Sequence, residues 1–114
     1  MKRMLKENSL KKKSILVTGG GSGLGRSMVE YFYDLGADII ITSRRENLLT
    51  KVAKEITSSK KGNILPLACD VRNIDEVNNV IKKSFDEFGK VDCLVNNAAG
   101  NFISPTERLS TRAF

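Results

Sequence analysis

Four short apolar runs alternate along the chain with longer segments whose apolar residues recur at helical spacing. The runs are rich in Ile, Val and Leu without polar alternation, which is typical of strands buried on both faces. The segments between them are long enough for crossover helices. The pattern therefore predicts βαβ units and a parallel sheet covered on both faces. The predicted strands are Ser14–Thr18, Ile39–Thr42, Ile64–Ala68 and Val91–Val95.

Three amphipathic helices are predicted between these strands. Gly36 gives the first helix a stop signal, and Asp75 with Glu76 suits the first turn of the third. Pro66 cannot donate a backbone hydrogen bond, so it favours an edge position for the third strand. The apolar stripes are Leu24, Met28, Tyr31, Phe32 and Leu35; Leu48, Leu49, Val52, Ala53 and Ile56; and Ile74, Val77, Ile81, Phe85 and Phe88.

The domain organisation predicted is one domain over residues 14–114, preceded by a basic leader over residues 1–13. A doubly wound dinucleotide fold has about six parallel strands. Four strands fit before Phe114, and Thr106–Phe114 has the pattern of a helix that is beginning. We therefore expect an α/β, Rossmann-type doubly wound parallel sheet of which this chain is the N-terminal part, about four strands with three helices.

Composition excludes several classes of protein. With 40% hydrophobic and 28% charged residues in 114, the chain is typical of a globular domain rather than a disordered one. No apolar run approaches the roughly 18 residues of a membrane span. Cys69 and Cys93 are an isolated pair in apolar surroundings, which favours a reducing compartment. The absence of His removes His-based acid–base catalysis and most zinc sites, so no metal site is predicted.

The formal charge of +6 is concentrated in the leader. Residues 1–14 carry six Lys and Arg against Glu7 alone, which leaves thirteen basic and twelve acidic groups in the rest. A solvated leader is the preferred interpretation, with a targeting peptide and a polyanion-binding arm as alternatives. The leader has no interleaved aromatic residues, so we expect no nucleic-acid partner. It is short and poor in Arg and Ser, which favours the cytoplasm, with mitochondria as the alternative.

A glycine-rich segment joins the first predicted strand to the first predicted helix. Glycines there allow a sharp turn, a close approach of backbone to a pyrophosphate and tight packing of helix on sheet. The helix N-terminus then offers free N–H groups to the phosphates. The residues predicted to bind a cofactor in this segment are Thr18, Gly19, Gly20, Gly21, Ser22, Gly23, Leu24 and Gly25.

The glycines allow two other interpretations. One is a generic glycine turn, which the placement between strand and helix makes less favourable. The other is a P-loop over Gly20–Ser27, but Arg26 stands where that motif requires Lys. No strand ending in a Walker-B-like carboxylate accompanies it.

The end of the second predicted strand indicates which cofactor is bound. An NAD-binding fold has Asp or Glu there for the ribose 2′-OH, whereas this chain has Ser43, Arg44 and Arg45. Asp38, the acid that precedes them, begins the strand instead. A hydroxyl and two guanidinium groups suit a 2′-phosphate, which predicts NADP(H). The alternative is that both arginines are solvated residues of the first helical turn.

The spacing of Thr18, Gly19, Gly23 and Gly25 fits T-G-x-x-x-G-x-G and resembles the short-chain dehydrogenases/reductases. Further matching segments bring the resemblance closest to the 2,4-dienoyl-CoA reductases and their bacterial relatives, over about Ser14 to Phe114. One extra Ala departs from the general family's N-N-A-G element. The segments are Ser43–Arg45, Cys69–Arg72 and the long run from Asn96 to Ser110.

The resemblance implies roles for individual residues. Asp70, with Val71 beside it, would hydrogen-bond the adenine ring, and Asn96 would brace the sheet beside the cofactor. Ala98, Ala99 and Gly100 would let backbone approach the ribose. Positions matching Arg44 and Asp70 contact NADP in such relatives, and Arg44 is placed to serve the substrate also. The positions expected at the CoA thioester are Arg44, Arg72, Phe102 and Ser110.

The function implied is NADPH-dependent reduction of 2,4-dienoyl-CoA in β-oxidation of unsaturated chains, by a homo-oligomer when full-length. The family's catalytic Asn, Tyr (or Ser) and Lys follow the N-N-A-G element beyond Phe114, so no catalytic residue is named. Alternatives are a half-domain that binds nucleotide without catalysis, a family member acting on another carbonyl or alcohol, and a basic nucleic-acid binder. The chain alone is expected to be inactive and to associate through an unpaired edge of its fourth strand.

Overall fold

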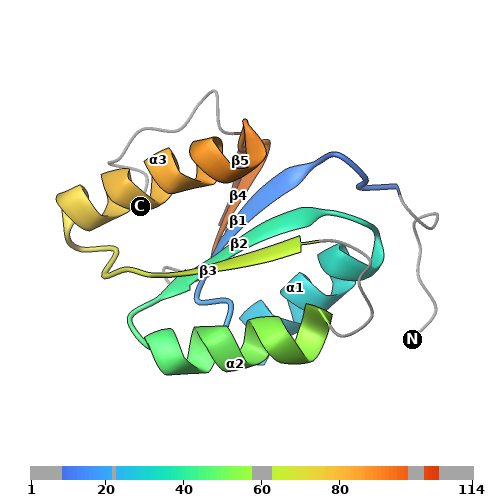
Figure 1. The fold of residues 1–114 in the computed structure, drawn as a ribbon, viewed down its shortest axis with the longest axis horizontal. Helices are drawn as coiled ribbons and strands as arrows, with labels where there is room; N and C mark the ends of the chain where they lie inside the picture. The colour runs from blue at the N-terminus through green and yellow to red at the C-terminus, as the bar shows by residue number, and fades with distance from the viewer. Residues whose placement is uncertain (1–8, 22, 58–62, 98–101, 106–114) are drawn as a thin grey trace.

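A computed structural model describes residues 9–21, 23–57, 63–97 and 102–105, the last of these as backbone only. Strands and helices alternate along the chain up to β4 (Figure 1). The elements are β1 (Ser14–Thr18), α1 (Gly23–Asp34), β2 (Asp38–Ser43), α2 (Glu46–Ile56), β3 (Asn63–Ala68), α3 (Ile74–Phe88), β4 (Cys93–Asn96) and β5 (Phe102–Pro105).

The sheet has the strand order β3-β2-β1-β4-β5, and its first four strands are parallel. This order confirms the predicted N-terminal part of a Rossmann-type sheet, in which the chain crosses over after β3 to pair β4 with β1. It also confirms the edge position that Pro66 predicts for β3. The fourth strand begins at Cys93 rather than Val91 and continues to Asn96.

The prediction that the fourth strand has an unpaired edge is wrong. Strand β5 pairs antiparallel with β4 along its whole length, from Cys93 opposite Pro105 to Asn96 opposite Phe102. The chain therefore reverses direction after β4, and its own backbone takes the position at which an unpaired edge was expected. Only four residues form this strand, too few for an alternating pattern to be recognised. The helix expected over residues 106–114 lies outside the described residues.

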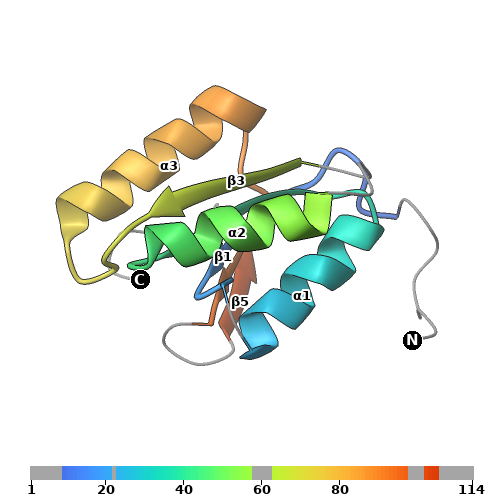
Figure 2. The ribbon, with the colours of Figure 1, turned by 60° about the horizontal axis from the view of Figure 1, so that its bottom comes forward.

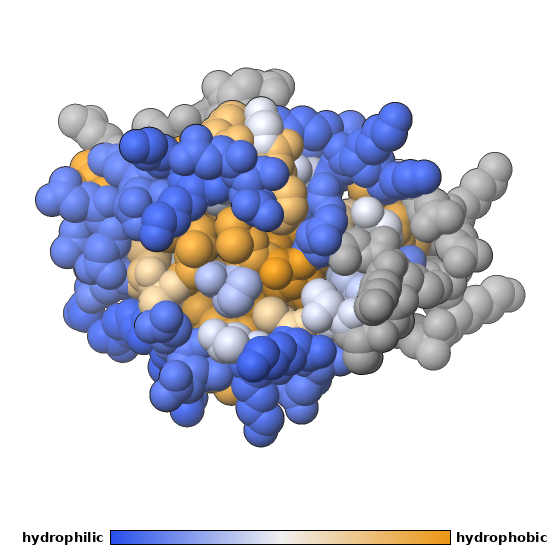
Figure 3. Space-filling model, in the orientation of Figure 1, coloured by the Kyte–Doolittle hydropathy of each residue, from blue (hydrophilic) through white to orange (hydrophobic). Residues whose placement is uncertain are grey.

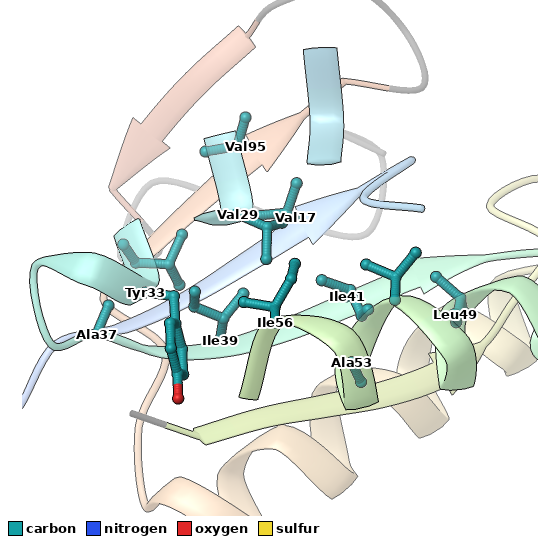
Figure 4. Packing of buried hydrophobic residues seen from close by; sticks show 12 residues of the cluster. Val17, Val29, Tyr33, Ala37, Ile39, Ile41, Leu49, Ala53, Ile56 and Val95 are labelled. Carbon is teal, nitrogen blue, oxygen red and sulfur yellow. The ribbon is translucent and has the colours of Figure 1, made fainter. Parts of the chain in front are cut away.

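Helices cover both faces of the sheet (Figures 1 and 2). Helices α1 and α2 lie on one face, where Val29 and Leu49 pack with Ile39 and Ile41 of β2 (Figure 4). Helix α3 lies on the other face, where Val77 packs in a second cluster. The second cluster also contains Leu16, Ile40, Cys69, Val80, Val91 and Leu94. Neighbouring residues of β1 and β2 thus serve opposite faces, as the pleat of a strand requires.

Among the described residues β3 is an edge strand, and the side chains of its central residues, Ile64 to Leu67, are only half-buried. Figure 3 shows the apolar surface that results between the two helical layers. In the described part of the chain, no helix is both long enough and apolar enough to cross a membrane.

Candidate functional site

The carboxyl ends of β1, β2 and β3 are tied together by backbone hydrogen bonds that extend the sheet. The Gly19 N–H donates to the Thr42 carbonyl at 2.7 Å, and the Cys69 N–H donates to the Ser43 carbonyl at 2.8 Å. The loops that follow the three strands therefore meet at one end of the sheet, where ligands bind in open α/β folds. They enclose a hollow of about 330 Å³. Its lining residues are Gly19, Thr42, Ser43, Arg44, Cys69, Asp70, Val71 and Arg72.

The glycine-rich loop has the backbone geometry that its sequence predicts. Gly19 and Gly23 have φ values of 68° and 56°, in the left-handed region that favours glycine. A Cβ atom on Gly25 would overlap the Gly19 carbonyl oxygen, so glycine there allows α1 to approach β1 closely. No acidic residue stands in the first turn of α1 to oppose an anion. The loop therefore fits the pyrophosphate of a dinucleotide.

The end of β2 presents a hydroxyl and a guanidinium to the hollow. The Ser43 Oγ accepts a hydrogen bond from the Arg45 N–H at 3.1 Å, which leaves the hydroxyl hydrogen available to donate. Arg44 lines the hollow with an exposed side chain. Among the residues that line the hollow, Asp70 is the acidic one, and it lies at the end of β3 rather than β2.

Asp70 and Arg72 form a bidentate ion pair at the mouth of the hollow. The Arg72 Nε donates to Asp70 Oδ1 and its Nη2 donates to Oδ2, each at 3.1 Å. The Arg72 backbone N–H also donates to Oδ1, at 2.9 Å. The hydrogen bonds from Arg72, assisted by the charge of Arg44, lower the pKa of the Asp70 carboxyl to about 2. Asp70 is therefore ionised throughout the physiological range of pH.

Two asparagines connect the end of β4 to β1 and to the glycine loop. The Thr18 hydroxyl donates to Asn96 Oδ1 at 2.9 Å, and both side chains are buried. The Asn97 Nδ2 donates to the Gly19 carbonyl at 3.3 Å. Sequence reasoning named Asn96 and missed Asn97, although the Asn pair at a strand end was a usable signal.

Two further residues of the hollow were missed from sequence. Cys69 is buried, and its loss of solvation raises the pKa of the thiol, so it stays protonated. Thr42 is fully buried beside it in the lining. Both lie at strand ends, which is the signal that could have identified them. No group of three or more His, Cys, Asp or Glu residues suited to a metal is found within the described ranges.

The structure brings together six of the predicted site residues and distributes the others. The hollow contains Gly19, Ser43, Arg44, Asp70, Val71 and Arg72. Gly20 and Gly21 are buried close to Ile41 and Leu48, while Leu24 and Arg45 are exposed and lie outside the lining. Phe102 lies in β5, of which the backbone alone is described. The predicted residues Ser22, Ala98, Ala99, Gly100 and Ser110 lie outside the described residues.

The P-loop alternative receives no support from Arg26. Its Nε donates to Glu30 of α1 at 2.9 Å and its Nη1 donates to Glu55 of α2 at 3.1 Å. The guanidinium thus links two helices instead of facing a phosphate site.

Known proteins are similar to this chain in sequence and in fold. The probable 2,4-dienoyl-CoA reductase 3 of Caenorhabditis elegans is 43% identical over 111 residues, which cover 96% of this chain and 36% of that protein. The chain thus spans about a third of the length of this relative. The crystal structure of L-sorbose reductase from Gluconobacter frateurii with NADPH and L-sorbose matches with a TM-score of 0.77 and 26% identity, over 95% of this chain and 41% of that one.

A third relative carries the other nicotinamide cofactor. The 3-ketoacyl-(acyl-carrier-protein) reductase of Brucella melitensis, complexed with NADH, matches with a TM-score of 0.69 and 35% identity, over 75% of this chain and 34% of that one. The family model of the short chain dehydrogenases matches residues 13–114, nearly the whole chain. The glycine loop, the parallel sheet and these matches agree: the chain belongs to the short-chain dehydrogenase family.

Proposed function

We propose that this chain is the nucleotide-binding part of an NADPH-dependent short-chain reductase that acts on 2,4-dienoyl-CoA. The observation that supports the cofactor most strongly is the end of β2, where Ser43 and Arg44 line the hollow without a neighbouring carboxylate on that strand. The substrate class rests on the resemblance to dienoyl-CoA reductases, because relatives with that name cover nearly all of this chain.

A 2′-phosphate would bind at the end of β2 through two kinds of donor. Ser43 offers its hydroxyl hydrogen, since the Oγ already accepts from the Arg45 N–H. Arg44 offers a planar fork of N–H groups and a full positive charge, which suits a phosphate better than a ribose hydroxyl. A carboxylate at the end of this strand, as in NAD-binding folds, would repel the phosphate instead.

The remaining residues would orient the cofactor along the ends of the strands. The glycine loop and the first turn of α1 would hold the pyrophosphate, and Asp70 with Val71 would hold the adenine. Thr18 and Asn96 would keep the end of β4 in register with β1 beneath it. When bound, the cofactor supplies a hydride. Arg44, Arg72, Phe102 and Ser110 are proposed to contact the CoA thioester, which remains a prediction from the resemblance.

A second candidate function is a nucleotide-binding half-domain without catalysis. The observation that favours it is that the described residues line a hollow suited to a nucleotide, while none of them is assigned a catalytic role. Cytoplasmic placement, homo-oligomerisation in the full-length protein and the solvated leader stay predictions. The hollow would bind nucleotide equally in both candidates, so nucleotide binding tests what they share.

Calorimetric titration of the 114-residue chain with adenosine 2′,5′-bisphosphate and with adenosine 5′-monophosphate tests the cofactor site. We expect the bisphosphate to bind about 10-fold or more tightly, because hydrogen bonds to charged groups contribute about 1.5–3 kcal/mol. Arg44→Ala should remove most of this preference. Lys82→Ala, which removes one exposed charge from α3, should leave it unchanged. Equal affinities for both nucleotides in the unmodified chain would reject NADP selectivity.

The substrate class needs a protein that contains this chain together with the downstream catalytic part. With NADPH, we expect faster turnover of a 2,4-dienoyl-CoA than of a 3-ketoacyl thioester. The opposite preference would reject the dienoyl-CoA assignment and support a family member acting on another carbonyl. Absence of turnover on both, with the bisphosphate preference intact, would favour the binding half-domain.

A further inference from the structure

We propose that Asp70 is a positioning residue for Arg72, and that the Arg72 guanidinium so held forms with Arg44 a two-arginine clamp for a ribose phosphate. The proposal rests on the proposed function, since it concerns the same nucleotide-binding hollow. The ligand chemistry is an adenosine nucleotide with a phosphomonoester on its ribose. Such a group is found at the 2′ position of NADPH and at the 3′ position of coenzyme A.

The geometry of the ion pair leaves half of the guanidinium available. Asp70 occupies the Nε–Nη2 edge of Arg72 through both of its carboxylate oxygens. The five N–H groups of a guanidinium form two such edges, so the Nη1–Nη2 edge retains donors for a second bidentate partner. Arg72 therefore can hold a phosphate while Asp70 continues to hold Arg72.

Asp70 is itself fixed to the end of the sheet. Its N–H donates to Glu76 Oε1 at 3.3 Å, and its carbonyl accepts from the Asn73 N–H at 2.9 Å. The backbone N–H of the preceding residue, Cys69, donates a hydrogen bond to the Ser43 carbonyl at the end of β2. The Asp70 side chain, which is 29% exposed, thus anchors the Arg72 side chain, which is 75% exposed. An exposed arginine otherwise samples many rotamers, and ordering them costs entropy when a ligand binds.

The charges that line the hollow allow the proposal to predict the direction of a change in anion affinity. The hollow has two guanidinium groups, of Arg44 and Arg72, and one carboxylate, of Asp70. By Coulomb's law alone, removal of the Asp70 charge should strengthen the binding of an anion. If Asp70 acts by positioning Arg72, the same change should weaken it. Asp70→Asn therefore separates the two effects.

The experiment measures a phosphate preference, defined as the Kd of adenosine 5′-monophosphate divided by the Kd of each bisphosphate. The 114-residue chain is titrated with adenosine 2′,5′-bisphosphate and with adenosine 3′,5′-bisphosphate. The division cancels any contact of Asp70 with the adenine, which all three nucleotides share. We expect Asp70→Asn and Arg72→Ala each to lower the preference about threefold to fivefold, the upper part of the range for an exposed charge pair.

Two further variants test the route of the effect. In the double variant, which combines Asp70→Asn with Arg72→Ala, the phosphate preference should be no lower than in Arg72→Ala alone, because Asp70 acts through Arg72. Arg72→Lys keeps the charge without the planar fork and should behave like Asp70→Asn. Asp86→Asn on α3 removes an exposed negative charge as a control, and it should leave the preference unchanged.

The outcomes distinguish this proposal from the proposed function. A loss confined to the 2′,5′ isomer assigns the clamp to the cofactor, and a loss confined to the 3′,5′ isomer assigns it to the CoA end of the substrate. An unchanged or increased preference in Asp70→Asn, with Arg44→Ala still reducing it, overturns the positioning role alone. Absence of any preference in the unmodified chain overturns the proposed cofactor site and the clamp together.

Discussion

The Thr18 hydroxyl donates a 2.9 Å hydrogen bond to Asn96 Oδ1 across 78 positions of sequence. Thr18 ends β1 and Asn96 ends β4, and the two are direct partners in the parallel register. The bond lies beneath the glycine loop, at the point where the strand order reverses. It therefore links the first strand to the one that follows the long crossover, beside the expected position of the cofactor.

Thr18→Val should destabilise the chain by about 1–3 kcal/mol, because the substitution takes a donor from a buried acceptor while keeping the shape of the side chain. Urea unfolding followed by circular dichroism measures this change. Thr18→Ser retains the hydroxyl and should lose less. Unchanged stability in Thr18→Val would show that this hydrogen bond does not stabilise the chain measurably.

Gly25→Ala should destabilise by about 3 kcal/mol, at the upper end for overpacking, because the new Cβ overlaps the Gly19 carbonyl oxygen and backbone must move. Gly23→Ala is the matched comparison. Its Cβ has no described atom within 4 Å, so its cost is the left-handed conformation alone, about 1–2 kcal/mol. Thermal unfolding of both variants checks the order. A larger loss at Gly23 would contradict the close approach of α1 to β1.

The stability of the chain should fall as pH drops below about 4, in part through Asp92. Burial raises the pKa of its carboxyl, but hydrogen bonds from the Ser14 N–H and the Lys90 ammonium outweigh it and lower the pKa overall. A lowered folded-state pKa contributes stability that is present above the unfolded value and is lost as pH falls through the folded value.

Asp92→Asn should therefore lower Tm at pH 7. It should also make Tm fall less steeply as the pH is lowered below 5, as measured by thermal scans. Asp70 contributes with the same sign, so part of the decrease should remain. Asp86→Asn, at an exposed position of α3, serves as the control. A decrease of unchanged steepness in Asp92→Asn would remove this carboxylate from the explanation.

Arg44→Ala in a protein that contains this chain and the downstream catalytic part should weaken NADPH binding by about 1.5–3 kcal/mol. Binding of NADH should barely change, because NADH lacks the 2′-phosphate that Arg44 is proposed to hold. Fluorescence titration with each cofactor measures both effects, and Lys82→Ala controls for net charge. Similar losses for NADPH and NADH would exclude Arg44 from the 2′-phosphate site.

The sequence alone determined the alternation of strands and helices, because periodicity is a local property that each segment carries by itself. Ser14–Thr18 and the apolar stripe of α1 could be recognised in this way, and so could the glycines between them. The edge position of β3 followed from Pro66, since a residue without an N–H fits poorly in a central strand.

Only the tertiary structure decided which strand ends meet and what covers each edge. Strand β5 was not recognised, because a four-residue strand is defined by its pairing with β4 rather than by a pattern of its own. Asp70 and Arg72 were predicted for different ligands, whereas the turn after β3 joins them in one ion pair. Distances between side chains depend on backbone direction and register, which no local pattern of residues specifies. Hydrogen bonds such as those of Thr18 and Asn97 therefore became visible only once the strands were in place.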